Sequence, residues 1–252
     1  MPDADTPHHP ALDALLSGMT SAATASGRAP ARLLAVSKTQ PADAIASVAA
    51  ALRARVAPGP VAFGENYVQE ALAKQPSLGG LGIEWHLIGH LQSNKAREAA
   101  SAFDWVQTVD RPKLVEALAK HRAPGQRPLN VLIQVNIDDE ASKHGCRLED
   151  VDALADAITN EPRLALRGLM AIPAPHPDKD RRRAAFRRMR ELFDALASHH
   201  AGVDTLSMGM SDDYALAIAE GATMVRVGSA LFGARPPKPA STTQPPTHPE
   251  SP

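Results

Sequence analysis

The stretch Leu33-Leu34-Ala35-Val36-Ser37-Lys38-Thr39-Gln40-Pro41 decides the interpretation of this sequence. It begins as a short apolar run of strand length, and Pro41 disfavours helix at Gln40. An alanine-rich segment with helical periodicity follows, so Lys38 is expected at the carboxyl end of a strand in a βα unit. Chemistry gathers at that end in parallel α/β proteins. A lysine there can act as an amine nucleophile and form a Schiff base, although a solvated strand-end charge would give the same pattern.

The βα rhythm that begins at this stretch repeats along the chain. Most connections are too long for hairpins, and the strands are continuous apolar runs, so the sheet should be parallel. The pattern predicts an α/β fold, a single (β/α)8 TIM-type barrel with an extra N-terminal helix over residues 11–26. A doubly wound sheet is the alternative, but no G-x-G-x-x-G follows the first strand. Strands are expected at 32–37, 61–65, 84–89, 105–109, 129–137, 164–172, 205–208 and 223–227, and helices at 42–53, 67–74, 94–102, 112–122, 148–159, 180–199 and 212–220.

Composition bounds the domain organisation and the location. The chain has 252 residues, a net charge of −1 and one cysteine, which fits one barrel in a reducing cytoplasm. Residues 1–10 are expected to form a flexible leader, 11–235 the barrel, and 236–252 a disordered Pro-rich tail. No apolar run approaches the roughly 18 residues of a membrane-spanning helix. We therefore expect a cytoplasmic protein without a membrane partner. We also expect a monomer.

One segment resembles a nucleic-acid-binding helix in its charge. Arginines cluster between Arg181 and Arg190, and an apolar stripe that includes Phe186 and Phe193 runs along the same segment. The outer helix of a barrel, with one solvated face, explains both features. Aromatic residues are too scarce for a platform that stacks single-stranded bases. No nucleic-acid partner is expected.

Polar residues follow several of the other predicted strands. Asn66, after the second strand, can contact a ligand or simply cap the next helix. His86 and His90 lie four apart in a strand, with no cysteine or carboxylate cluster nearby, so no metal site is expected. Small residues and hydroxyls follow the seventh and eighth strands, the recurrent phosphate position in such barrels. These are Ser207, Gly209, Gly228 and Ser229.

Arg226 lies inside the apolar run of the eighth strand. The alternation of a strand places it on the same face as Gly228, and an arginine that lines a barrel needs a partner. An internal salt bridge, for example to Glu65, is one possibility. A hydrogen bond to a ring nitrogen is the other. Lys38 for an aldehyde, an arginine for a pyridine nitrogen and a phosphate cup together indicate pyridoxal 5′-phosphate (PLP).

Several motifs resemble those of the pyridoxal phosphate homeostasis protein family. The resemblance spans residues 11–235, and leaves out the leader and the tail. Family members have a single barrel similar to the N-terminal domain of alanine racemase. The motifs are A-V-S-K-T at 35–39, F-G-E-N-Y at 63–67, H-L-I-G-H-L-Q-S-N-K at 86–95, G-L-M-A-I-P at 168–173, L-S-M-G-M-S-D-D at 206–213 and R-V-G-S-A-L-F-G at 226–233.

This resemblance implies a role for each candidate residue. Lys38 would form the Schiff base with the cofactor, and Arg226 would face the pyridine nitrogen. Asn66 and Met208 would line the cofactor. The residues around the phosphate would be Ser207, Gly209, Gly228 and Ser229.

Two functions of different classes remain open. A cofactor carrier in PLP (vitamin B6) homeostasis, with apo-enzymes as possible recipients and without robust catalysis, is the first. A PLP-dependent amino-acid racemase or lyase is the alternative. A two-base racemase of the alanine type takes an acid–base group from a second, all-β domain, and only a polar tail follows Arg235. An arginine at the ring nitrogen also weakens the electron sink. Both features favour the carrier.

Overall fold

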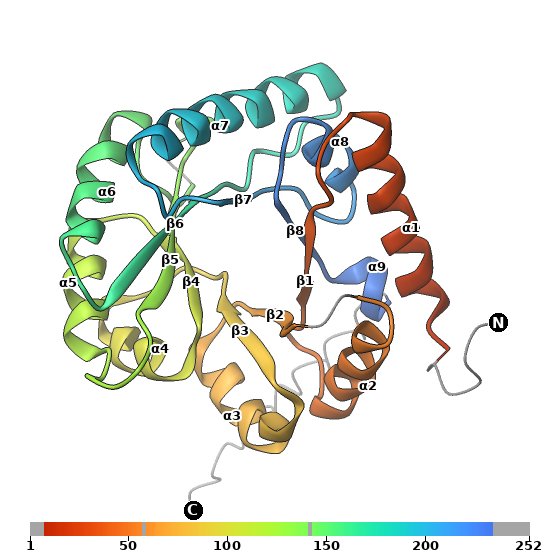
Figure 1. The fold of residues 1–252 in the computed structure, drawn as a ribbon, viewed down its shortest axis with the longest axis horizontal. Coiled ribbons are helices and arrows are strands. Elements are labelled where there is room, and N and C mark those ends of the chain that lie inside the picture. The colour runs from red at the N-terminus through yellow and green to blue at the C-terminus, as the bar shows by residue number, and fades with distance from the viewer. Residues whose placement is uncertain (1–7, 57–58, 141–142, 234–252) are drawn as a thin grey trace, which may run out of the picture.

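A closed barrel of eight parallel strands forms the centre of the molecule (Figure 1). The computed structural model describes residues 8–56, 59–140 and 143–233. Each strand pairs with the next in sequence, and the last pairs with the first. The (β/α)8 TIM-type barrel is therefore confirmed. The strands are β1 (Arg32–Val36), β2 (Val61–Glu65), β3 (Ile83–Leu87), β4 (Trp105–Val109), β5 (Leu129–Gln134), β6 (Leu164–Met170), β7 (Thr205–Ser207) and β8 (Met224–Val227).

Helices form a ring around the barrel, as Figure 1 shows. The expected N-terminal helix is present as α1, which packs against α8 and α9 on the outside of the ring. Three short 3-10 turns, Gly79–Leu81, Ser93–Lys95 and Leu148–Asp150, adjoin the helices. The α-helices are α1 (Pro10–Ala25), α2 (Ala42–Arg53), α3 (Val68–Leu78), α4 (Ala96–Ala102), α5 (Pro112–His121), α6 (Val151–Thr159), α7 (Lys179–His199), α8 (Tyr214–Ala219) and α9 (Ser229–Phe232).

Some boundaries differ from the expected ones. Helix α3 continues past Pro76 to Leu78, and β5 ends at Gln134, after which Val135 forms only an isolated bridge with Cys146. Helix α9, directly after β8, was not expected. The expected leader and tail fall largely on residues 1–7 and 234–252, which lie outside the described residues.

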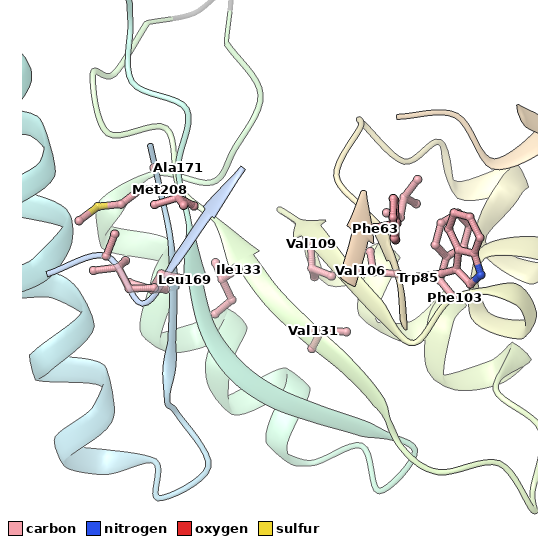
Figure 2. Close-up of a cluster of buried hydrophobic side chains, with 14 of the residues drawn as sticks. Phe63, Trp85, Phe103, Val106, Val109, Val131, Ile133, Leu169, Ala171 and Met208 are labelled. Atoms are coloured by element: carbon pink, nitrogen blue, oxygen red, sulfur yellow. The ribbon is translucent and has the colours of Figure 1, made fainter. Parts of the chain in front are cut away.

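The hydrophobic core has two layers because successive strand residues face opposite sides of the barrel wall. The outer layer lies between strands and helices, and Figure 2 shows part of it, with Phe63, Trp85 and Phe103 near one end and Leu169 and Met208 near the other. Inside the barrel, apolar residues form two small clusters. Polar side chains occupy interior positions as well: His86, Gln107, Ser207 and Arg226, each at most 4% exposed.

The basic segment is the outer helix α7. Its apolar residues, including Phe186 and Met189, are buried against the barrel, whereas Arg183 and Arg187 are exposed and pair with Glu220. This arrangement agrees with a solvated outer face. Among the described residues, no helix is both long and apolar enough to cross a bilayer.

Candidate functional site

A cavity of about 270 Å³ opens at the carboxyl end of the strands. Five of the predicted residues line it: Lys38, Asn66, Arg226, Gly228 and Ser229. They come from the ends of β1, β2 and β8, which are adjacent in the barrel. The remaining lining residues are Val36, Thr39, Gln40, Ile88, Ile172, Met210, Ser211, Asp212 and Gly233.

The backbone on both sides of Lys38 is held by α3. Lys74 donates from Nζ to the carbonyl oxygen of Ser37 at 3.0 Å and to Glu70 Oε1 at 2.6 Å. Glu70 in turn accepts the backbone N–H of Thr39, a residue in the left-handed region at φ 64°. A β-branched residue rarely adopts that conformation. The fold therefore fixes the chain immediately before and after the half-buried lysine.

Glu65 completes this network from the outer face of β2. Its Oε1 accepts hydrogen bonds from Ser37 Oγ at 2.6 Å and from Lys74 Nζ at 3.1 Å. Burial raises the pKa of this carboxyl, against the opposing effect of both partners. The salt bridge between Glu65 and Arg226 considered from the sequence is thus wrong, because the two side chains point to opposite sides of the barrel wall.

Arg226 projects into the barrel interior below the cavity mouth. It is 4% exposed, and its guanidinium donates to Ser207 Oγ and to the carbonyl oxygen of Ala171, both at 2.8 Å. Burial lowers its pKa to about 10, so the group stays charged near neutral pH. Within the described part of the chain no carboxylate forms an ion pair with it. A buried cation held by neutral groups is suited to an acceptor on a ligand.

Asn66 presents an unsatisfied acceptor. Its Oδ1 is buried and has no hydrogen-bond partner among the described residues. It does not cap α3, whose N-cap residue is Tyr67, so the capping interpretation is wrong. Gly89 at the end of the neighbouring strand allows this placement, because a Cβ there would lie 2.0 Å from the Asn66 carbonyl oxygen. A buried oxygen without a donor in a ligand-sized cavity indicates a missing partner.

The loops after β7 and β8 meet at the rim. Ser229 Oγ donates to Ser211 Oγ at 3.1 Å, and both residues line the cavity. Gly228 lies close to β1, where a Cβ would be 3.0 Å from the carbonyl oxygen of Val36. The short helix α9 begins at Ser229. Loops after the last two strands with a short extra helix are the usual phosphate position of this barrel.

Three other candidates do not line the cavity. Ser207 is fully buried, and its hydroxyl is engaged by Arg226 and Gln107. Met208 lies in the outer layer near Leu169, as Figure 2 shows. Gly209, at φ 90°, makes room for α8, since a Cβ there would lie 2.5 Å from Ala217 Cβ. Strand parity explains the first two placements: Ser207 faces inward and Met208 outward.

Sequence reasoning missed several lining residues. Ser211 belongs to a motif that was singled out, but its proximity to Ser229 depends on two loops meeting. Thr39 and Gln40 directly follow Lys38, so their adjacency in sequence was a usable signal. Ile172 and Met210, both exposed, supply apolar wall. Both lie in motifs that were singled out, but no role was assigned to either residue.

One cluster of potential metal ligands lies near the same mouth. His90, Asp110 and His144 have ligand atoms within 4.8 Å of one another. The two imidazole rings stack at 3.9 Å with an angle of 17° between their planes. Their lone pairs lie in these nearly parallel planes and cannot converge on one ion without ring rotation. The absence of a metal stays a prediction.

Comparison with known proteins relates this cavity to a family. A family model described as the alanine racemase N-terminal domain matches residues 11–236. The pyridoxal phosphate homeostasis protein of Pseudomonas aeruginosa is 55% identical over 216 residues, covering 85% of this chain and 90% of the relative. The Escherichia coli K12 protein of that name is 50% identical over 222 residues, covering 86% of this chain and 92% of the relative. This chain belongs to the pyridoxal phosphate homeostasis protein family.

Solved structures agree with membership of this family. PipY from Synechococcus elongatus, determined without PLP, superposes with a TM-score of 0.77 at 36% identity, covering 89% of this chain and 99% of PipY. A second PipY structure has PLP bound and gives a TM-score of 0.71 at 37% identity, covering 86% and 99%. Alanine racemase from Corynebacterium glutamicum shares the fold, with a TM-score of 0.58 at 23% identity; it covers 91% of this chain and 63% of the racemase.

Proposed function

We propose that this protein binds PLP as a Schiff base on Lys38 and acts in intracellular PLP homeostasis without robust catalysis. The observation that carries the proposal is one cavity lined by both Lys38 and the buried cation Arg226, beside the rim loops of β7 and β8. The relatives named for PLP homeostasis and the PLP-bound PipY structure support it.

Each lining residue has a defined part in holding the cofactor. Lys38 supplies the amine, and the α3 network orients the backbone that carries it. Arg226 offers N–H donors to the pyridine nitrogen, and Asn66 has an acceptor available to a donor on the cofactor. Ser211, Gly228 and Ser229 form the rim at which the phosphate would bind. Ser207 supports Arg226 rather than the phosphate, and Met208 and Gly209 contribute through packing.

The same residues favour holding the cofactor over catalysis. When bound, PLP withdraws electrons from a substrate most strongly if its ring nitrogen is protonated. Arg226 keeps its own proton near neutral pH, so it can only donate to that nitrogen. The protein would then carry PLP as a cytoplasmic monomer and release it to apo-enzymes.

The test is chemical and uses the full chain. Purified protein is incubated with PLP, reduced with borohydride, digested and mapped by mass spectrometry. One PLP per chain, attached to Lys38, is expected. Addition of common amino acids should give turnover no faster than free PLP gives. Labelling that falls mainly on another lysine of the wild-type protein would refute the site, and rapid racemisation would favour the enzyme alternative.

A further inference from the structure

A continuous row of hydrogen bonds crosses the barrel interior from Arg226 to Glu84. Arg226 bonds to Ser207 Oγ at 2.8 Å, and Ser207 Oγ bonds to Gln107 Oε1 at 2.7 Å. Gln107 Nε2 lies 2.9 Å from His86 Nδ1, and His86 Nε2 lies 2.7 Å from Glu84 Oε1. The four linkages join β8, β7, β4 and β3, so the row runs from the cavity towards the opposite end of the barrel.

The two ends of the row impose a direction on it. An arginine can only donate hydrogen bonds, so Ser207 must accept from Arg226 and use its own hydrogen for Gln107. Glu84 is an acceptor at the other end. Burial raises the pKa of this carboxyl, but the hydrogen bond from His86 and the nearby positive charge of Arg32 outweigh burial and lower the pKa to about 2. An ionised carboxylate requires a proton on His86 Nε2.

The amide and the imidazole between these ends then have one consistent arrangement. Gln107 accepts with its oxygen and donates with its nitrogen to His86 Nδ1, which must carry a lone pair. If the amide were reversed, its oxygen would face Nδ1, which would need a proton in addition to the one on Nε2. That would place a cation on a side chain that is 0% exposed and whose ring stacks on Trp105, with the ring centroids 5.0 Å apart. Burial lowers the pKa of His86 at this position. Every bond therefore donates from Arg226 towards Glu84.

We propose that Ser207, Gln107 and His86 are positioning residues, which form a one-way hydrogen-bond relay that holds Arg226 with its remaining donors toward the ring nitrogen of bound PLP. The proposal rests on the proposed function, because it concerns the same cofactor. Apart from the relay, the guanidinium has one hydrogen bond among the residues that the structure describes, to the carbonyl oxygen of Ala171. If the bond to Ala171 were its only contact, the guanidinium could still rotate about that bond. The relay therefore determines the direction in which the remaining N–H groups of Arg226 point.

The decisive comparison is between two barrel glutamines. Gln107→Leu breaks the relay at its middle. Gln134→Leu is the matched control, since Gln134 is also buried but its amide bonds to the carbonyl oxygen of His144. We expect Gln107→Leu to weaken PLP binding about threefold to tenfold, the equivalent of one misplaced hydrogen bond. It should also change the circular dichroism signal of PLP, normalised to the amount of PLP that is bound. Gln134→Leu should change neither, even if both variants lose thermal stability.

Equal effects of the two leucine variants on PLP binding and dichroism would overturn the proposal. A wild type that fails to bind PLP would instead overturn the proposed function.

The direction of the relay can be tested without any substitution. Nitrogen NMR of the wild-type protein labelled in histidine should show His86 neutral, with the proton on Nε2. A proton on Nδ1 would contradict the relay. If Gln107→Leu does not fold, Ser207→Ala removes the link next to Arg226 with a smaller change in volume. It should give the same loss of affinity and altered dichroism, and a wild-type result would count against the proposal.

Discussion

At the scale of single residues, the site divides into residues that sequence identified and residues that only the fold reveals. Lys38 and Arg226 were identifiable because a strand-end lysine and an arginine within an apolar run both need an explanation. Ser207, Met208 and Gly209 were expected around the cofactor, but they do not line the cavity. A motif shows which residues are adjacent in sequence. Whether each side chain points into the barrel or away from it depends on its position in the strand, and a shift of one residue moves the side chain to the opposite face of the sheet.

Gly228 gives the prediction that separates the phosphate rim from a generic lysine pocket. Gly228→Val adds a side chain whose Cβ would lie 3.0 Å from the Val36 carbonyl oxygen, beside Ser229. If charge-assisted bonds at the rim hold the phosphate, PLP should bind the wild type about a hundredfold more tightly than pyridoxal does, since each bond contributes roughly 1.5–3 kcal/mol. In Gly228→Val this preference should largely disappear. Titrations of PLP and pyridoxal against both proteins measure this preference. Equal affinities of the wild type for the two aldehydes would contradict phosphate binding at the rim.

Gly89 provides a prediction about Asn66. In Gly89→Ala, the new methyl group would lie 2.0 Å from the Asn66 carbonyl oxygen, so the backbone of Asn66 must move. We expect a loss of about 1–3 kcal/mol in the free energy of unfolding, as for other overpacked sites, and weaker PLP binding. Gly80→Ala is the control, because nothing lies within 4 Å of its Cβ position. Urea unfolding and PLP titration distinguish them, and unchanged PLP binding in Gly89→Ala would exclude Asn66 from the site.

At the scale of elements, periodicity predicted the barrel because each strand is a short apolar run followed by an amphipathic helix. The expected bounds of α2, β2 and β4 agree with the structure residue for residue. The errors have local causes. The predicted helix over residues 67–74 ends before Pro76, although the packed helix α3 tolerates a proline near its last turn. Helix α9 has four residues, too few for a periodic signal.

Glu84, near the start of β3, gives a prediction about how stability depends on pH. The pKa of Glu84 falls from 4.5 in the unfolded chain to about 2 in the folded protein. A depressed pKa stabilises the fold above pH 4.5, and this contribution is lost as the pH falls towards 2. Its upper limit is about 3 kcal/mol. Glu84→Gln should therefore be less stable than the wild type at pH 7, and the difference should shrink between pH 4.5 and pH 2. Urea unfolding at several pH values tests this, and a constant difference would contradict the ionised carboxylate.

At the scale of the whole molecule, the stability of the barrel should not depend on residues 236–252. This segment contains seven prolines and no apolar periodicity, so we expect it to contribute no core. Deletion of the segment should leave the melting temperature and the bound PLP per chain unchanged. A lower value of either would show that the segment docks on the barrel.

Closure of the barrel between β1 and β8 has a consequence for the protein as it is made. Arg32–Ala35 pair with Met224–Val227, which are almost two hundred residues away along the chain. Lys38 therefore leaves the ribosome long before Arg226 exists. Contacts between distant segments also form late in folding because loop closure costs entropy. A nascent chain thus has the reactive lysine without the pocket, and the complete cofactor site arises only once the last strand has been translated and has closed the ring.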